Sequence, residues 1–214
     1  MNARTIALLV VLTLAAGYVD AVAFFALGVF TANMTGNTVL LGGALAARWL
    51  GGIPLTGSIG ILLPALSLGA FVVGAFAAAR VLRGETARPP VRSIGMVAAV
   101  VALLAASAWL QRGGARLAPL DVALLSAAMG VQSVVAVRAG VPGVSTTFVT
   151  GTLVTAVVHF EGLPQPQRAE AGTNAAIWAC YLAGAVAGTA ALHVLGVNAL
   201  WVPAVVVALL TPMI

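Results

Sequence analysis

The sequence contains very little charge. Only 7% of its 214 residues are charged, and its ten basic residues are all arginines, with no lysine. An ordinary soluble domain carries about a quarter charged residues, so this chain has too few to cover a water-soluble fold. The arginines lie near the ends of apolar stretches or in short connections. That placement is typical of membrane topology signals and not of a nucleic-acid surface, so no nucleic-acid partner is expected.

Residues that carry catalysis or bind metals are also scarce. The single cysteine, Cys180, excludes a disulfide framework. The two histidines, His159 and His193, have no third ligand at metal-binding spacing, so we expect no metal and no cofactor. The sequence shows no Ser/His/Asp set, no His-Glu-x-x-His motif and no paired catalytic carboxylates. We therefore expect that the protein is not an enzyme.

The chain is rich in aliphatic residues. Hydrophobic residues make up 62% of it, and its mean hydropathy is +1.12. About twenty apolar residues cross the hydrocarbon core of a bilayer. The sequence therefore predicts an all-α integral membrane protein, surrounded by the lipid bilayer, with about six full spans: 5–29, 58–82, 92–110, 119–138, 173–196 and 198–214.

Two further segments, 31–47 and 144–160, begin with polar residues and are too short in apolar sequence for a full crossing. They are predicted to be re-entrant or broken. With six spans and a cytoplasmic N-terminus, seven arginines lie inside (Arg4, Arg80, Arg83, Arg88, Arg92, Arg138, Arg168) and three outside (Arg48, Arg112, Arg116). If both segments crossed fully, five arginines would lie inside and five outside. The positive-inside rule favours six spans.

An internal repeat relates the two halves. Residues 17–39 resemble 130–154, which sets Gly17 on Gly130, Asp20 on Ser133, and Thr35-Gly36-Asn37 on Thr150-Gly151-Thr152. A weaker match sets 70–81 on 184–194. Because each half contains three full spans, the second must be inverted relative to the first, as in many transporters. The repeats are expected at 1–110 and 111–214, within one membrane domain.

The stretch "FTANMTGNTVLLG" (30–42) concentrates hydrogen-bonding side chains in the first short segment. A helix that begins inside the membrane leaves its first four N–H groups without partners. We expect Asn33 and Thr35 to cap it, Gly36 to permit a sharp entry, and Asn37 to face a solute. Thr150, Gly151 and Thr152 repeat the arrangement. Two such helix starts near the midplane would favour an anion or the negative end of a polar solute. The alternative is that these residues only cap and pack buried half-helices.

Asp20 lies within the first span, where a carboxylate costs about 2.5 to 3.5 kcal/mol on insertion scales. It is a candidate for coupling or gating: it could carry a proton, bind a cation or pair with Arg138. Alternatively it is hydrated near the interface, or bonds the Asn33 and Asn37 amides structurally. Gln132 and Ser133 occupy the equivalent place in the second half, and Gln132 is assigned to the candidate solute site.

Small residues recur four positions apart, at Ala70 with Gly74 and at Gly184 with Gly188. This spacing predicts close helix packing. Contact within the chain is the favoured interpretation, and contact between protomers of a homo-oligomer stays open.

The stretch "GYVDAVAFFALGVFTANMTGN" resembles the YoaK-like family of small bacterial membrane proteins of unknown function. The later stretches "MGVQ", "STTFVTGTL" and "GTNAAIWACYLAGAVAG" follow in the family's order, so the resemblance covers nearly the whole chain. It implies a multi-pass protein of the bacterial inner membrane and implies no substrate.

The sequence taken together predicts a transporter or channel for a small polar or anionic solute, with its site near the midplane between the two broken segments. The alternative is a non-catalytic membrane scaffold or regulatory subunit.

Overall fold

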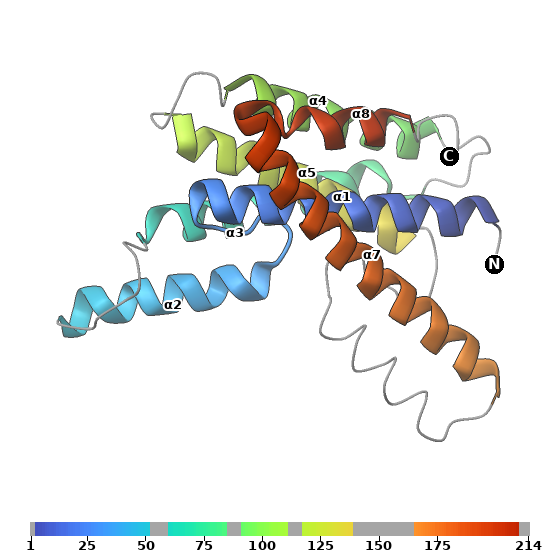
Figure 1. The fold of residues 1–214 in the computed structure, drawn as a ribbon, viewed down its shortest axis with the longest axis horizontal. Coiled ribbons are helices and arrows are strands. Elements are labelled where there is room, and N and C mark those ends of the chain that lie inside the picture. Colours follow the sequence, from blue (N-terminus) through green and yellow to red (C-terminus); the bar gives the residue numbers. More distant parts are fainter. Residues whose placement is uncertain (1–2, 52–59, 85–90, 111–116, 139–164, 210–214) are drawn as a thin grey trace.

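The computed structural model describes residues 3–51, 60–84, 91–110, 117–138 and 165–209, which are helices and short connections without strands (Figure 1). The elements are α1 (Ala3–Leu27), α2 (Met34–Leu50), α3 (Leu62–Val81), α4 (Val91–Leu110), α5 (Ala118–Arg138), α7 (Gln165–Leu195), the 3-10 turn η3 (Gly196–Asn198) and α8 (Trp201–Ala208).

Five of these helices are long and apolar enough to cross a membrane, over Ile6–Leu27, Leu62–Val81, Ser93–Leu110, Ala118–Arg138 and Gly172–Asn198. They coincide with five of the six expected spans and confirm an all-α, multi-pass membrane protein. The sixth expected span, 198–214, corresponds to η3 and α8, and residues 210–214 lie outside the described part. The expected short segment 144–160 lies outside it as well.

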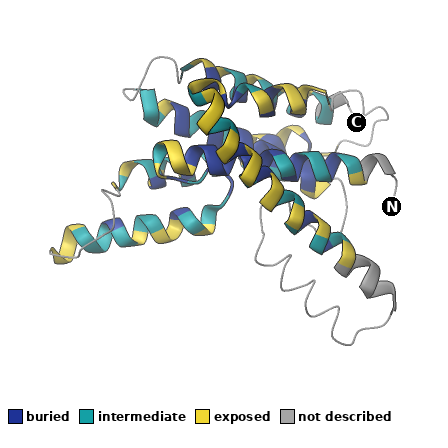
Figure 2. Ribbon diagram, viewed as in Figure 1, coloured by how far each residue is buried: buried dark blue, intermediate teal, exposed yellow. Residues whose placement is uncertain are grey.

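Helices α1 and α5 occupy the middle of the bundle, where buried residues concentrate (Figure 2). They run antiparallel, because Leu27 and Leu117 line one cavity while Gln132 bonds to Leu12. Leu63, at the start of α3, lines that cavity too. The chain between α1 and α3 therefore returns to the end of the bundle from which it left. Helix α2 lies within that returning stretch, and its buried residues are Asn37 and Ala44.

The closest helix contacts join α1 to α7 and α3 to α5, and Figure 1 shows α7 crossing α1. Glycine permits both approaches. A Cβ atom on Gly17 would lie 2.1 Å from the carbonyl oxygen of Tyr181, and one on Gly184 would lie 2.1 Å from that of Leu14. On α5, a Cβ at Gly130 would lie 2.2 Å from the carbonyl oxygen of Phe71. The prediction of close packing within the chain is confirmed for Gly74, Gly184 and Gly188.

The two close pairs use corresponding positions. Gly17 meets the backbone of Tyr181 and Ala185, and its aligned partner Gly130 meets that of Phe71 and Ala75. If Gly17 and Gly130 correspond, these contacts set position 71 on 181 and 74 on 184, about one helical turn away from the match that begins by setting 70 on 184. Aliphatic helices resemble one another at several registers, so only the backbone contacts fix the correct one.

The outer faces of α3 and α7 expose large apolar side chains such as Val72, Phe76 and Val186. Because α3 and α7 are membrane-spanning helices, this surface faces lipid and needs no further cover.

Candidate functional site

Asp20 is the centre of the candidate site. It lies in the last third of α1, is 2% exposed, and accepts hydrogen bonds from the backbone N–H groups that precede α2. The N–H groups of Thr31 and Ala32 donate to its Oδ1 over 2.7 and 2.6 Å, and that of Asn33 donates to Oδ2 over 2.9 Å. The Thr31 hydroxyl donates to Oδ1 as well, over 3.2 Å. Donors that would otherwise be unsatisfied in an apolar layer are thus bound by a carboxylate.

The chain reaches this geometry by turning back after α1. Gly28 has a φ of 76°, a left-handed conformation that favours glycine, and it ends the helix. Residues 29–33 then return to the level of Asp20, which is seven residues before Leu27. At 1.5 Å per residue, α2 therefore begins about 10 Å short of the end of α1.

Tyr181 joins this group from α7, in the other half of the chain. Its hydroxyl donates to Oδ2 of Asp20. One carboxylate therefore binds both the start of α2 and a helix that is 161 residues away in sequence. Charge-assisted hydrogen bonds of this kind are stronger than neutral ones and offset part of the cost of burying the charge.

Asn37 fixes the same turn from the other side. Its Oδ1 accepts from the N–H of Phe30 over 3.0 Å, and its Nδ2 donates to the carbonyl oxygen of Phe30 over 2.7 Å. Nδ2 also donates to the hydroxyl of Ser67 on α3 over 2.8 Å. That hydroxyl lies 2.8 Å from the hydroxyl of Ser126 on α5. We call the set formed by Asp20, Phe30–Asn33, Asn37, Ser67, Ser126 and Tyr181 the polar junction.

The predicted capping of α2 holds for one residue of two. Asn33 is the N-cap, and its side chain accepts from the N–H of Gly36 over 3.2 Å. Thr35, by contrast, is exposed and forms no cap. The expected role of Gly36 in a sharp entry is also wrong, because Gly36 is helical. A Cβ there would lie 2.6 Å from the Phe30 ring, so glycine makes room for packing.

These bonds bear on the expected anion site. The N–H groups of residues 31–33 are bound to Asp20, and that of Gly36 is bound to Asn33. These four N–H groups of the first half are therefore bound within the chain and are not available to a solute. Thr150, Gly151 and Thr152, the corresponding residues of the second half, lie outside the described residues.

Gln132 lies apart from the polar junction, in the core of α5. It is 1% exposed, and its Nε2 donates to the carbonyl oxygen of Leu12 over 2.8 Å. Its Oε1 is buried without a hydrogen-bond partner in the described structure. An unpaired buried acceptor costs about 1 to 3 kcal/mol, so this atom is a candidate contact for a hydrogen-bond donor.

The proposed pairing of Asp20 with Arg138 is wrong. Gln132 lies beside Leu12, and Arg138 is six residues farther along α5. Because α5 is antiparallel to α1, this places Arg138 toward the N-terminal end of α1 and Asp20 toward the other end. The rise per residue puts them about 20 Å apart. Arg138 is also exposed, whereas Asp20 is buried.

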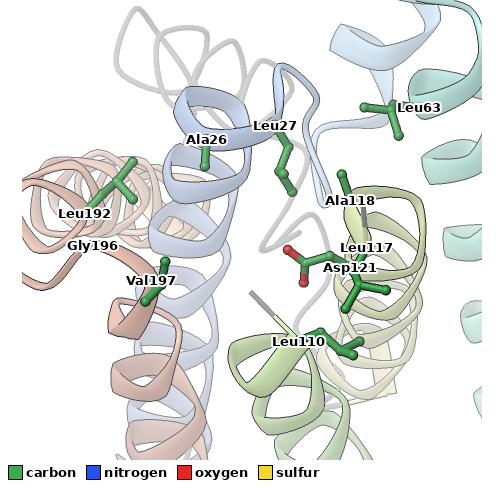
Figure 3. A pocket seen from close by; sticks show the side chains of 10 residues that line it. All are labelled: Ala26, Leu27, Leu63, Leu110, Leu117, Ala118, Asp121, Leu192, Gly196 and Val197. Atoms are coloured by element: carbon green, nitrogen blue, oxygen red, sulfur yellow. The ribbon is translucent and has the colours of Figure 1, made fainter. Parts of the chain in front are cut away.

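Sequence reasoning missed Tyr181, Ser67 and Asp121. Asp121 stands in the first turn of α5, is 2% exposed, and accepts a hydrogen bond from the Ser107 hydroxyl. Its carboxylate faces a cavity of about 500 Å³ at the end of the bundle (Figure 3). A carboxylate near the start of a span suggests a hydrated helix end, and that pattern concealed its burial.

The fold and the buried polar junction define a multi-pass helical membrane protein. The chain belongs to the family described as "Protein of unknown function (DUF1275)", whose model matches residues 8–213. It is similar to the UPF0700 transmembrane protein YoaK of Bacillus subtilis (strain 168), with 31% identity over 162 residues that cover 72% of this chain and 67% of that protein. The YoaK-like resemblance is confirmed. No solved structure matches the chain.

Proposed function

We propose that the protein is a membrane transport protein, a carrier or channel, for a small polar or anionic solute. The observation that carries this proposal is the polar junction, in which a helix starts within the depth of a membrane span and is bound to a buried carboxylate. Broken helices and intramembrane charges are expensive in a bilayer. In membrane proteins such features occur mainly along solute pathways, where they bind or move the solute.

The arrangement of the helices supports the proposed inverted repeat. Helix α1 packs on α7 through the same positions by which α5 packs on α3, and α1 and α5 run antiparallel. The stretch between α1 and α3 leaves and returns at one end of the bundle. These features are those of a 3+3 inverted repeat with a re-entrant segment around α2, an architecture used by many secondary transporters.

Within this proposal, Asp20 is the coupling or gating group. It binds the start of α2 through backbone donors and α7 through Tyr181, so loss of its charge weakens both connections at once. Gly28, at the left-handed turn after α1, provides a place for the backbone to rotate. Arg138 has no part in this mechanism.

The solute site proposed here combines the unpaired Oε1 of Gln132 with Thr150, Gly151 and Thr152. The amide oxygen accepts hydrogen bonds, which suits a polar solute. The anionic alternative depends on the three residues of the second half, since Asp20 and Asn33 bind the donors of the first. The proposal also places the protein in the lipid bilayer of the bacterial inner membrane with a cytoplasmic N-terminus. It includes a non-enzymatic role and a capacity to form homo-oligomers.

The second candidate is a non-catalytic membrane scaffold or regulatory subunit. One observation favours it: the side-chain hydrogen bonds of Asn37 go to Phe30 and Ser67 of the same chain. Such a network has a complete structural explanation without a solute.

Flux measurement distinguishes the two candidates. The purified protein is reconstituted in liposomes, and swelling is followed by light scattering in iso-osmotic solutions of small sugars, polyols, amino acids, amines and carboxylates. Transport predicts faster swelling than in protein-free liposomes for at least one solute class, with the rate changed at least threefold by Asp20→Asn or Tyr181→Phe. Tyr181→Phe serves if Asp20→Asn does not fold. Swelling identical to that of empty liposomes for every class would exclude the proposal and favour a scaffold.

A further inference from the structure

A buried amide on α5 has an oxygen that the chain itself does not use. Gln132 is 1% exposed, and its Nε2 donates to the carbonyl oxygen of Leu12 over 2.8 Å. That bond identifies the nitrogen of the amide, because a carbonyl oxygen accepts hydrogen bonds and cannot donate them. The other end, Oε1, is therefore an acceptor, and it is buried without a hydrogen-bond partner in the described structure. A ligand that donates a hydrogen bond to Oε1 would remove the cost of leaving it unpaired.

Asn174 on α7 repeats this feature. It is 1% exposed, and its Oδ1 is buried without a partner among the described residues. It precedes Tyr181 by seven residues, or about 10 Å along the helix. Helices α1 and α7 end at the same cavity and so run parallel, which places Asn174 toward the N-terminal end of α1. Gln132 lies in the same direction from the polar junction, because its partner Leu12 precedes Asp20 on α1.

Asp20 has no acceptor position left for a cationic solute. Its Oδ1 accepts from the N–H and the hydroxyl of Thr31 and from the N–H of Ala32. Its Oδ2 accepts from the N–H of Asn33 and the hydroxyl of Tyr181. A carboxylate has about four acceptor positions, so these five bonds use all of them. A cation that bound Asp20 would have to displace donors that hold the start of α2.

Charged side chains are also remote from the free oxygen of Gln132. The buried polar side chains of the described residues include no arginine and no histidine. Arg138, six residues beyond Gln132, is exposed, and Asp121 lies eleven residues before it, about 16 Å away along α5. A buried ion without an opposite charge is far more costly than a neutral polar group that is hydrogen-bonded. The surroundings of this oxygen therefore favour a neutral ligand over an anion or a cation.

We propose that the solute is a neutral molecule with several hydrogen-bond donors, a polyol or a small amide, and that the Oε1 of Gln132 accepts from one of its O–H or N–H groups. This inference rests on the proposed function and narrows it, because it selects the neutral class among polar and anionic solutes. The Oδ1 of Asn174 is a second acceptor for such a solute. Uncharged acceptors satisfy hydroxyl and amide donors and leave an ionic solute without a counter-charge.

Uptake of labelled solutes into proteoliposomes at pH 7 tests the charge class. Glycerol, erythritol, urea and acetamide form the neutral set, and serinol and glycerate are the cationic and anionic analogues of glycerol. Potassium with valinomycin holds the membrane potential at zero. We expect at least one neutral solute to enter at least threefold faster than in protein-free liposomes, and both ions to enter at the protein-free rate. Faster protein-dependent uptake of either ion than of the neutral set would overturn the neutral class and leave transport standing.

Variants of Gln132 assign the selectivity to its free oxygen. Gln132→Leu removes this oxygen and should lower neutral uptake at least tenfold. Thr13→Val is the matched control, since Thr13 is buried on α1 and its hydroxyl donates to Leu9 of the same helix, and it should keep wild-type uptake. If Gln132→Leu does not fold, Gln132→Glu decides at pH 8, where a carboxylate at this place should raise serinol uptake relative to glycerol at least threefold. Unchanged uptake in the folded variant would overturn the proposal.

Binding separates a failure of this inference from a failure of transport. The melting temperature of the detergent-purified full chain is measured with each probe, because a ligand of the folded state raises it. A rise with a neutral probe that Gln132→Leu abolishes, without uptake of any probe, would support the site and contradict the proposed function. No rise and no uptake with any neutral probe would overturn the inference.

Discussion

At the residue scale, three polar side chains hold the turn between α1 and α2: Asp20, Asn33 and Asn37 bind the backbone of residues 30–36. Asp20, Asn33 and Asn37 stand out in an aliphatic chain because buried polar groups are costly. Their partners depend on the turn after Gly28, which brings the N–H groups of residues 31–33 back beside α1. No spacing in the sequence reveals that return. Tyr181 was missed for the same reason, since its contact with Asp20 depends on helix packing.

Removing the charge of Asp20 should destabilise the protein. In Asp20→Asn the amide N–H₂ replaces one acceptor oxygen, so a donor such as the N–H of Asn33 loses its partner. We expect a loss of about 1 to 3 kcal/mol in the free energy of unfolding, measured by reversible unfolding in mixed micelles. Ser133→Ala, at the aligned position of the second half, should cost less than about 0.5 kcal/mol. Equal losses would contradict the special role of Asp20.

Asn37 and Thr35 form a second matched comparison, two positions apart on α2. Asn37→Ala leaves the N–H of Phe30 without its side-chain partner and removes one of the two side-chain donors to its C=O, the other being the Ser67 hydroxyl, so we expect a loss of about 2 kcal/mol. Thr35 is exposed, and Thr35→Ala should change stability by less than about 0.5 kcal/mol. The same unfolding assay measures both. A larger loss of stability for Thr35→Ala than for Asn37→Ala would show that Asn37 does not stabilise the turn between α1 and α2.

At the element scale, the expected spans are close to the observed ones, because long apolar runs leave few alternatives. The predicted bounds of the short segment are less accurate. It was expected over 31–47, whereas α2 covers Met34–Leu50, and the first three residues belong to the turn bound by Asp20. The pairing of helices was not predictable, because glycine spacing indicates close contact without naming the partner. Backbone approach at Gly17, Gly74 and Gly130 supplies that information.

Two glycines of α3 test the importance of this approach. A Cβ at Gly74 would lie 2.2 Å from the carbonyl oxygen of Ala127, whereas one at Gly69 meets nothing within 4 Å. Gly74→Ala must push α3 away from α5 and should cost about 2 kcal/mol or more. Gly69→Ala should be neutral or stabilising by up to about 1 kcal/mol, because alanine favours helix. Comparable melting temperatures for the two variants would contradict the close packing.

At the scale of the whole molecule, each half packs on the other. Helix α1 contacts α7, and α3 contacts α5, so helices of the first half of the chain pack on helices of the second half. The sequence could not show this exchange of partners. The cavity beside Asp121 depends on the same exchange, since its walls come from both halves. Its position was therefore outside the reach of sequence reasoning.

Membrane orientation provides a separate prediction. With a cytoplasmic N-terminus, Arg83 lies inside and Leu195 outside, because α3 and α7 run in opposite directions. In a Cys180→Ala background, a membrane-impermeant maleimide added to spheroplasts should label Leu195→Cys and leave Arg83→Cys unlabelled until the cells are lysed. The opposite pattern would invert the topology and move the Asp121 cavity to the cytoplasmic face.

The central claim is that Asp20 joins the start of α2 to α7 of the opposite half. A double-mutant cycle with Asp20→Asn and Tyr181→Phe, measured by reversible unfolding in mixed micelles, tests it most directly. The contact predicts a favourable coupling energy of about 0.5 to 2 kcal/mol between the two side chains. Strict additivity of the two substitutions would contradict it, because groups that do not interact lose their stabilisation independently.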